Sequence, residues 1–182
     1  MESKNKNNVV FVLRHGHVKR NKSIDEKKYN KQANKNVQII KDIMRLSKIN
    51  TAELVFLCSP FKRCLETASI IIHKLKKINP KIKTSIEKDE NLTRWDRKES
   101  RQYSFDRSRK YGKEIKKTLL EEKNKFYFLV THSSVIFTVV EGITNIEIPH
   151  KELKAGAIFV ADFKDNKIVK KDAFRSNRLY RY

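Results

Sequence analysis

The sequence VVFVLRHGH at residues 9–17 decides the fold. Its first five residues are apolar without a break, which is typical of a short strand buried on both faces of a sheet. The run then ends in the charged pair Arg14 and His15, followed by Gly16. Because open α/β sheets bind their ligands at the carboxyl ends of the strands, we expect Arg14 and His15 to lie at such a site.

Two further apolar runs have the same form. Residues 54–58 precede a Ser-Pro pair, and residues 126–130 precede Thr131 and His132. Apolar residues at helical spacing lie between and after these runs. They predict four helices. The first covers 33–49, and the second begins with Ser59 as N-cap and Pro60 at N1 and ends just before Asn79. The third runs from 111 to about 124, and the fourth from 133 or 134 to 142.

The remaining segments complete the expected topology. Residues 17–32 are polar and irregular, so we expect a loop or flap there, whereas residues 82–86 predict a weak, half-exposed strand. Residues 157–163 and 168–174 flank an Asp-Asn pair and predict a hairpin. Strands that alternate with helices predict an α/β three-layer sandwich, with helices on both faces of a mostly parallel sheet and an antiparallel edge.

Composition sets the wider expectations. The 182 residues contain no low-complexity linker and no repeat, so we expect one domain over 1–182. No apolar run is long enough for a membrane span, and the polar N-terminus lacks the apolar segment of a secretion signal. Two cysteines are too few for a disulfide framework. A reducing, intracellular compartment fits these features, cytoplasmic by preference, with the nucleus left open.

The net charge of +21 has two interpretations. One is a polyanionic partner, such as nucleic acid, a phosphoprotein or an anionic surface. The other is codon bias, because lysine far outnumbers arginine and AT-rich codons also favour the abundant Asn and Ile. Under either interpretation the electrostatic field draws anionic ligands toward the molecule.

The three strand ends together indicate a specific chemistry. In a parallel sheet they lie at one edge, which would bring Arg14 and His15 together with His132 and with Arg63 from the helix after the second strand. Helix N-termini attract anions through their free N–H groups and the helix dipole. Arginine binds phosphate oxygens in a bidentate manner. The pattern therefore predicts a pocket for a phosphoryl group.

Three motifs in this order and at these spacings resemble the histidine phosphatase superfamily, which includes the cofactor-dependent phosphoglycerate mutases. They are LRHG at 13–16, SPxxRxxETA at 59–68 and TH at 131–132. The resemblance implies that the His15 imidazole is a nucleophile that forms a phosphohistidine, and that no metal or other cofactor is required. It also implies a set of residues that hold the phosphoryl oxygens: Arg14, Arg63, His132 and, at the position of an Asn in the mutase-like branch, Asn21.

The chain departs from the family pattern at four positions. His17 stands where Glu often follows the Arg-His-Gly motif, and Val18 follows it. Ser133 occupies the position of a Gly or, in one branch, of a proton-donating Asp. Most important, Leu92-Thr93-Arg94 places an arginine where many members have a proton-donating Glu.

The general acid is therefore not evident from the sequence. Possible replacements are Glu90, Asp96 and His17, with Asp89 as a further candidate. The loss of a general acid typically costs ~10²–10⁴ in rate. The loss matters little when the leaving group departs easily, as it does from a phosphohistidine, an acyl phosphate or an aryl phosphate.

The sequence predicts a phosphatase that hydrolyses a phosphomonoester or an activated phosphoryl group through His15. Insertions between the core elements are short, so we expect an open site that takes a phosphoprotein or another bulky anion, with a small-molecule phosphate as the other possibility. A catalytically weak member that only binds anions, and a phosphoglycerate mutase-like phosphotransferase, are the alternatives. The oligomeric state stays open.

A cluster of basic and aromatic residues surrounds Trp95. Such clusters can bind nucleic acid, but they can equally form a rim that admits polyanionic substrates, or a solvated loop with one buried aromatic anchor. Nucleic acid is thus a possible partner but not the favoured one. The other members of the cluster are Arg94, Arg97, Arg101, Tyr103, Arg107 and Arg109.

Overall fold

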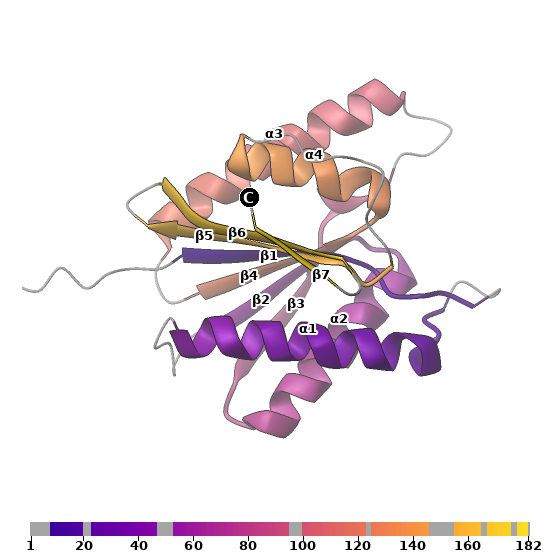
Figure 1. Cartoon of the computed structure of the whole chain (residues 1–182). Coiled ribbons are helices and arrows are strands. Elements are labelled where there is room, and N and C mark those ends of the chain that lie inside the picture. The colour runs from indigo at the N-terminus through magenta and orange to yellow at the C-terminus, as the bar shows by residue number, and fades with distance from the viewer. Residues whose placement is uncertain are drawn as a thin grey trace, which may run out of the picture.

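The structure is a computed structural model, and it describes residues 8–19, 23–46, 53–94, 100–122, 125–145, 155–164, 167–175 and 178–181. Strands and helices alternate along the first part of the chain, and three strands follow one another at its end (Figure 1). The elements are β1 (Asn8–Arg14), α1 (Glu26–Leu46), β2 (Glu53–Cys58), α2 (Lys62–Ile78), β3 (Lys83–Lys88), the 3-10 helix η1 (Glu90–Leu92), α3 (Arg101–Glu121), β4 (Lys125–Thr131), α4 (Ser133–Thr144), β5 (Ile158–Lys164), β6 (Lys167–Arg175) and β7 (Arg178–Arg181).

The strands form one sheet in the order β3-β2-β4-β1-β5-β6-β7. The strands β3, β2, β4 and β1 are parallel, and β5, β6 and β7 add an antiparallel side. Helices α1 and α2 cover one face of the sheet, while α3 and α4 cover the other (Figure 1). The predicted three-layer α/β fold is confirmed, and its antiparallel side has one strand more than the predicted hairpin. Among the described residues, no helix is both long and apolar enough to cross a membrane.

Burial on both faces of the sheet explains the unbroken apolar run at residues 9–13. Successive strand residues point to opposite faces, so Val9, Phe11 and Leu13 pack toward α1 and α2, while Val10 and Val12 pack toward α3 and α4. On the first face, the Phe11 ring stacks on Phe128 of β4, and Phe128 stacks on Phe56 of β2, with ring centroids 4.5 and 4.3 Å apart. The stack ties the three strands that lead to the predicted site.

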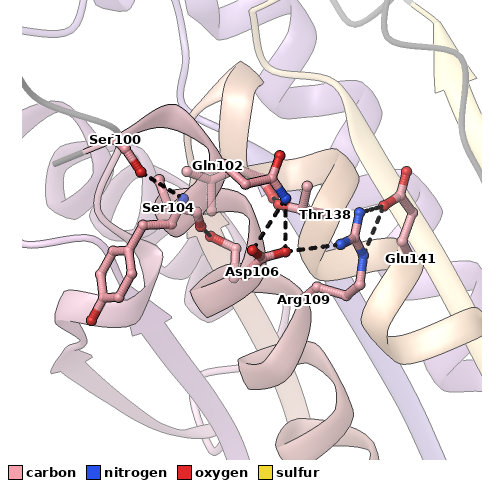
Figure 2. A network of polar contacts seen from close by, with 10 residues as sticks. Ser100, Gln102, Ser104, Asp106, Arg109, Thr138 and Glu141 are labelled. Carbon is pink, nitrogen blue, oxygen red and sulfur yellow. Dashed lines mark hydrogen bonds and ion pairs between the residues drawn. The ribbon is translucent and has the colours of Figure 1, made fainter.

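Helices α3 and α4 approach each other closely at two glycines. A Cβ atom on Gly112 would lie 2.3 Å from the carbonyl oxygen of Val139, and one on Gly142 would lie 2.1 Å from the carbonyl oxygen of Arg109. Beside this crossing, the Arg109 guanidinium bonds Glu141 at 3.0 Å and also reaches Asp106 (Figure 2). The two helices therefore form a fixed layer behind the sheet.

Helices α1 and α2 begin at other residues than the sequence predicts. Helix α1 begins at Glu26, so the loop predicted over 17–32 is wrong from residue 26 onward. The single apolar residue of its first turns, Tyr29, is fully buried, and one residue gives no periodic pattern. Helix α2 begins at Lys62 with Phe61 as N-cap, so the predicted N-cap Ser59 and its neighbour Pro60 both precede the helix.

The other two differences have the same cause, which is a lack of apolar residues. Helix α3 begins at Arg101, with Ser100 as its N-cap, well before the predicted start near Tyr111. Its first turns carry mostly charged and polar side chains, two of which, Ser104 and Ser108, are buried against the rest of the fold. The four-residue strand β7 pairs with β6, and its sequence gives no alternation long enough to predict it.

Candidate active site

The backbone around His15 is fixed by hydrogen bonds to neighbouring strands. The N–H of Arg14 donates to the carbonyl of Ala157 at 2.9 Å, and the N–H of His15 donates to the carbonyl of Thr131 at 2.9 Å. The carbonyl of His15 accepts from the N–H of Gly156 at 3.0 Å, where a φ of 77° favours glycine. Both backbone groups of His15 are thus hydrogen-bonded to neighbouring segments, which fixes the position of its Cα.

The position of Gly16 leaves no room for a side chain. A Cβ atom at this position would lie 2.6 Å from the ring of Tyr29, which rises from α1. The N–H of Gly16 donates to Oγ1 of Thr67 at 3.0 Å, and that hydroxyl donates to the carbonyl of Arg63 at 2.7 Å. These contacts attach the end of β1 to both α1 and α2.

The His15 imidazole is held in one tautomer. Its Nδ1 lies 2.8 Å from the carbonyl oxygen of Gly16. Because a carbonyl only accepts, Nδ1 must carry the proton, which leaves a lone pair on Nε2. Burial, followed by the charges of Arg63, Arg14 and Arg94, lowers the pKa of His15 to about 4. The ring is therefore neutral at pH 7, with Nε2 available as a nucleophile.

His132 lies opposite in the complementary tautomer. The ring centroids of His15 and His132 are 5.2 Å apart, with an edge-on geometry. The Arg63 guanidinium donates to Nδ1 of His132 at 3.1 Å, so Nε2 carries the proton and donates to Oγ of Ser59 at 2.9 Å. Burial and the charge of Arg63 lower the pKa of His132 to about 2, with smaller contributions from His15, Arg94 and Arg14.

Three arginines act on this pair of histidines. Arg63, in the first turn of α2, is 8% exposed, and burial lowers its pKa. Burial also lowers the pKa of Arg14. The guanidinium carbon of Arg63 lies 4.9 Å from the centre of the Phe61 ring, and that of Arg94 lies 5.9 Å from the centre of the same ring. The arrangement is a neutral histidine pair beside concentrated positive charge.

Side chains of the SPxxRxxETA motif at 59–68 form hydrogen bonds to several segments of the site. Its Glu66 accepts a hydrogen bond from the N–H of Ile24 at 2.6 Å, which fixes the chain ahead of α1. Ser59 and Arg63 hold His132 from its two ring nitrogens, and Thr67 holds Gly16. The polar side chains of the motif thus secure three segments around His15: the chain before α1, the end of β1 at Gly16, and His132.

Comparison with protein-family models finds no match, and comparison with curated proteins finds none. Solved structures do match. Phosphoglycerate mutase from Bacillus anthracis superposes with a TM-score of 0.61 at 14% identity, over 96% of this chain and 95% of that chain. Phosphoserine phosphatase from Entamoeba histolytica, in complex with 3-phosphoglyceric acid, gives 0.60 at 16% identity, over 96% and 97%. The protein histidine phosphatase SixA, complexed with tungstate, gives 0.56 at 15% identity, over 86% and 94%.

The chain has the fold of the histidine phosphatase superfamily. The resemblance drawn from the three motifs is confirmed at the level of this fold. In this chain, the histidine phosphatase fold brings together Arg14, His15, Arg63 and His132, the four residues that the sequence placed at the strand ends.

The candidate general acids are not gathered in the same way within this histidine phosphatase fold. The carboxylate of Glu90 is exposed and accepts from the hydroxyl of Thr93 at 3.0 Å. That of Asp89 caps η1 and accepts from the hydroxyl of Tyr111. The side chain of His17 is exposed. Asn21 and Asp96 lie outside the described residues, and their roles stay predictions.

Several residues of the site were not predicted. Phe61 meets the His132 ring edge-on, with centroids 5.1 Å apart. Thr131 donates its hydroxyl to the carbonyl of Leu92 at 2.6 Å, which joins η1 to the end of β4. The Ser59 and Thr67 hydroxyls lie within the quoted motif, so the motif carried a signal for them. In the part of the chain that the structure describes, no group of three or more His, Cys, Asp or Glu side chains is placed to hold a metal ion.

Proposed function

We propose that this protein is a phosphatase that hydrolyses a phosphomonoester or an activated phosphoryl group through a phosphohistidine on His15. The observation that carries the proposal is the His15 ring itself. Its Nδ1 proton is committed to the Gly16 carbonyl, its pKa is lowered to about 4, and its Nε2 is unprotonated beside Arg14, Arg63 and His132. A neutral imidazole positioned in this way is a capable nucleophile at neutral pH.

The first step transfers the phosphoryl group to the enzyme. The lone pair on Nε2 of His15 attacks phosphorus and forms an N–P bond while the P–O bond to the leaving group breaks, with its electron pair on the departing oxygen. Phosphoryl transfer depends mainly on positioning and charge stabilisation. We assign Arg14, Arg63 and His132 to the non-bridging oxygens of the phosphoryl group, and Asn21 to an additional contact. For His132 this means that its Nε2–H exchanges the Ser59 hydroxyl for a phosphoryl oxygen.

The second step returns the free enzyme. A water molecule attacks phosphorus, the N–P bond breaks, and its electron pair returns to Nε2 of His15. Both protons of the water leave with the product as dihydrogen phosphate, which then equilibrates with solvent. The fixed Nδ1–H bond to Gly16 keeps the ring in the same tautomer through both steps.

The solved structures with the same fold support a phosphatase. Three of them are named for phosphatase activities, on phosphoserine, on protein phosphohistidine and on ecdysone phosphate. Their identity to this chain is 12–16%, so they support the reaction class and leave the substrate open. The phosphoserine phosphatase and SixA also match this chain over nearly their whole length.

The test is hydrolysis of p-nitrophenyl phosphate, whose leaving group needs no proton. We expect wild type to release p-nitrophenol and to give a base-stable phosphoenzyme after rapid quenching, and we expect His15→Ala to lose both. His73→Ala, which replaces an exposed histidine on α2, is the matched control. Equal rates for wild type and His15→Ala would refute the proposal.

The arginine at position 94 favours a second candidate, a protein that binds a phosphorylated ligand without turning it over. This candidate predicts that calorimetry detects binding of phosphate or tungstate and that the binding weakens in Arg63→Gln. It also predicts that p-nitrophenyl phosphate is not hydrolysed. Release of p-nitrophenol that depends on His15 excludes it.

A further inference from the structure

We propose that Arg94 binds an anionic leaving group, and that the substrates of this protein are phosphoanhydrides, in which a phosphate departs. The inference rests on the proposed phosphatase reaction and specifies its substrate class. A fixed positive charge stands beside the reacting histidine at the position where the sequence pattern leads one to expect a proton donor. An arginine in place of a proton donor favours leaving groups that depart as anions over leaving groups that must be protonated.

The backbone at Arg94 is held close to the nucleophile by a chain of short contacts. Thr131, whose carbonyl accepts from the N–H of His15, donates its hydroxyl to the carbonyl of Leu92 at 2.6 Å. Leu92 is fully buried. The carbonyl of Thr93 accepts from the Arg107 guanidinium at 2.9 Å. Both residues before Arg94 are thus anchored, so the position of its Cα is set by the core.

The Arg94 side chain is directed to the site by an aromatic ring. Its guanidinium carbon lies 5.9 Å from the centre of Phe61, which packs edge-on against His132. Arg63 lies over the same ring at 4.9 Å. Cation–π contact holds both guanidiniums, but Arg63 is buried against His132 whereas Arg94 is exposed. Arg94 therefore occupies the solvent side of the phosphoryl pocket, where a leaving group would lie.

The guanidiniums of Arg63 and Arg94 repel each other. The charge of Arg94 contributes to the lowered pKa of Arg63 and of both histidines. One phosphoryl group in the inner pocket offsets the charge of Arg14 and Arg63. A second anionic group directly attached to it would lie toward Arg94 and offset the remaining charge. A diphosphate linkage supplies two such groups at adjacent positions.

Leaving-group chemistry favours the same class. An alkoxide is strongly basic and must be protonated as it departs, and an arginine cannot donate a proton at neutral pH. A departing phosphate that carries one proton leaves as hydrogen phosphate, which is far less basic than an alkoxide and needs no proton from the protein. Arg94 then acts as a fixed donor that stabilises the negative charge developing on the bridging oxygen. The N–P bond to His15 forms, the bridging P–O bond breaks, and its electron pair stays on the departing phosphate.

The experiment compares three probes in EDTA, so that the protein alone stabilises the leaving anion: inorganic pyrophosphate, β-glycerophosphate and p-nitrophenyl phosphate. We expect wild type to prefer pyrophosphate over β-glycerophosphate in kcat/KM. Arg94→Gln should lower kcat/KM for pyrophosphate ~10²-fold, by loss of one preorganised donor. It should lower kcat/KM for p-nitrophenyl phosphate less, because the single charge of p-nitrophenolate is delocalised away from the departing oxygen. Arg94→Lys, which keeps the charge, should restore part of the loss.

The matched control is Arg101→Gln, because Arg101 is also an exposed arginine over an aromatic ring, at 5.1 Å from the centre of Phe105. It should leave all three rates within a few-fold of wild type. A wild type that hydrolyses p-nitrophenyl phosphate but shows no preference for pyrophosphate would overturn the inference and leave the phosphatase intact. An equal loss on all three probes in Arg94→Gln would also overturn it. Failure on p-nitrophenyl phosphate itself would instead refute the proposed function.

Discussion

Mild acid should destabilise this protein through the two histidines of the site. His15 and His132 have pKa values of about 4 and about 2 in the folded chain, against the usual 6.5. Below pH 6.5 the unfolded chain therefore binds protons that the folded chain does not. The free energy of unfolding contributed by these groups is fully present above pH 6.5, and it is lost as the pH falls from there toward the folded values.

The size of the loss follows from the shifts. At one pH unit below 6.5, a histidine that stays neutral in the folded state costs about 1.4 kcal/mol. The partial exposure of His15 to solvent reduces its share. We therefore expect the free energy of unfolding to fall by roughly 2 kcal/mol between pH 7.5 and 5.5 through the two groups together.

Urea unfolding at pH 7.5, 6.5 and 5.5 measures this dependence. His15→Gln should remove about 1 kcal/mol of it, and His73→Gln, on the exposed side of α2, shows what replacing a surface histidine does. Long-range ¹H–¹⁵N NMR spectra of the ring nitrogens report the tautomers directly. We expect His15 protonated on Nδ1 and His132 on Nε2. A His15 ring that titrates near pH 6.5, or carries its proton on Nε2, would refute the reasoning.

Two further predictions concern Thr67 in the candidate site and Gly112 at the contact between α3 and α4. Thr67→Val should leave the N–H of Gly16 without its acceptor, which should lower the free energy of unfolding in urea by ~1–3 kcal/mol. Because the end of β1 then loses its anchor, the substitution should lower kcat on p-nitrophenyl phosphate more than it raises KM. Gly112→Ala should destabilise by ~1–3 kcal/mol with unchanged KM, since its Cβ would meet the carbonyl of Val139 at 2.3 Å; a stable variant would show that α3 can shift freely.

The core strands could be predicted because burial on both faces leaves a direct record in the sequence. β1, β2 and β4 are each a continuous apolar run, and the stacked rings of Phe11, Phe56 and Phe128 lie at their centres. Residues 26–32 left no such record. Their one buried side chain, Tyr29, packs against Gly16 and Gly156, and the second of these glycines is more than a hundred residues away. Only the tertiary structure creates the contact that makes this segment a helix.

The candidate site shows the same contrast between residues predicted from local sequence and residues fixed by long-range contacts. Arg14, His15, Arg63 and His132 were found because each stands at a strand end or in a helix's first turn, where local sequence predicts the position. The contribution of Ser59 was misassigned, since its hydroxyl is a partner of His132, 73 residues away, and its backbone lies alongside β4. A serine before a proline gives a strong N-cap signal, and the local signal was outweighed by a long-range hydrogen bond.

In the proposed reaction, the charges of the site would make the substrate part of the catalyst. Burial is the main cause of the low His15 pKa, and the guanidiniums of Arg63, Arg14 and Arg94 lower it further. A less basic imidazole is a weaker nucleophile, so these charges lower the nucleophilicity of His15 unless an anion offsets them. A bound dianion offsets the same charges and must raise the pKa of His15. In the proposed reaction, the arginines that attract a phosphoryl group thereby cease to lower the basicity of His15 once that group is in place. The basicity of His15 then recovers only when there is a phosphorus to attack.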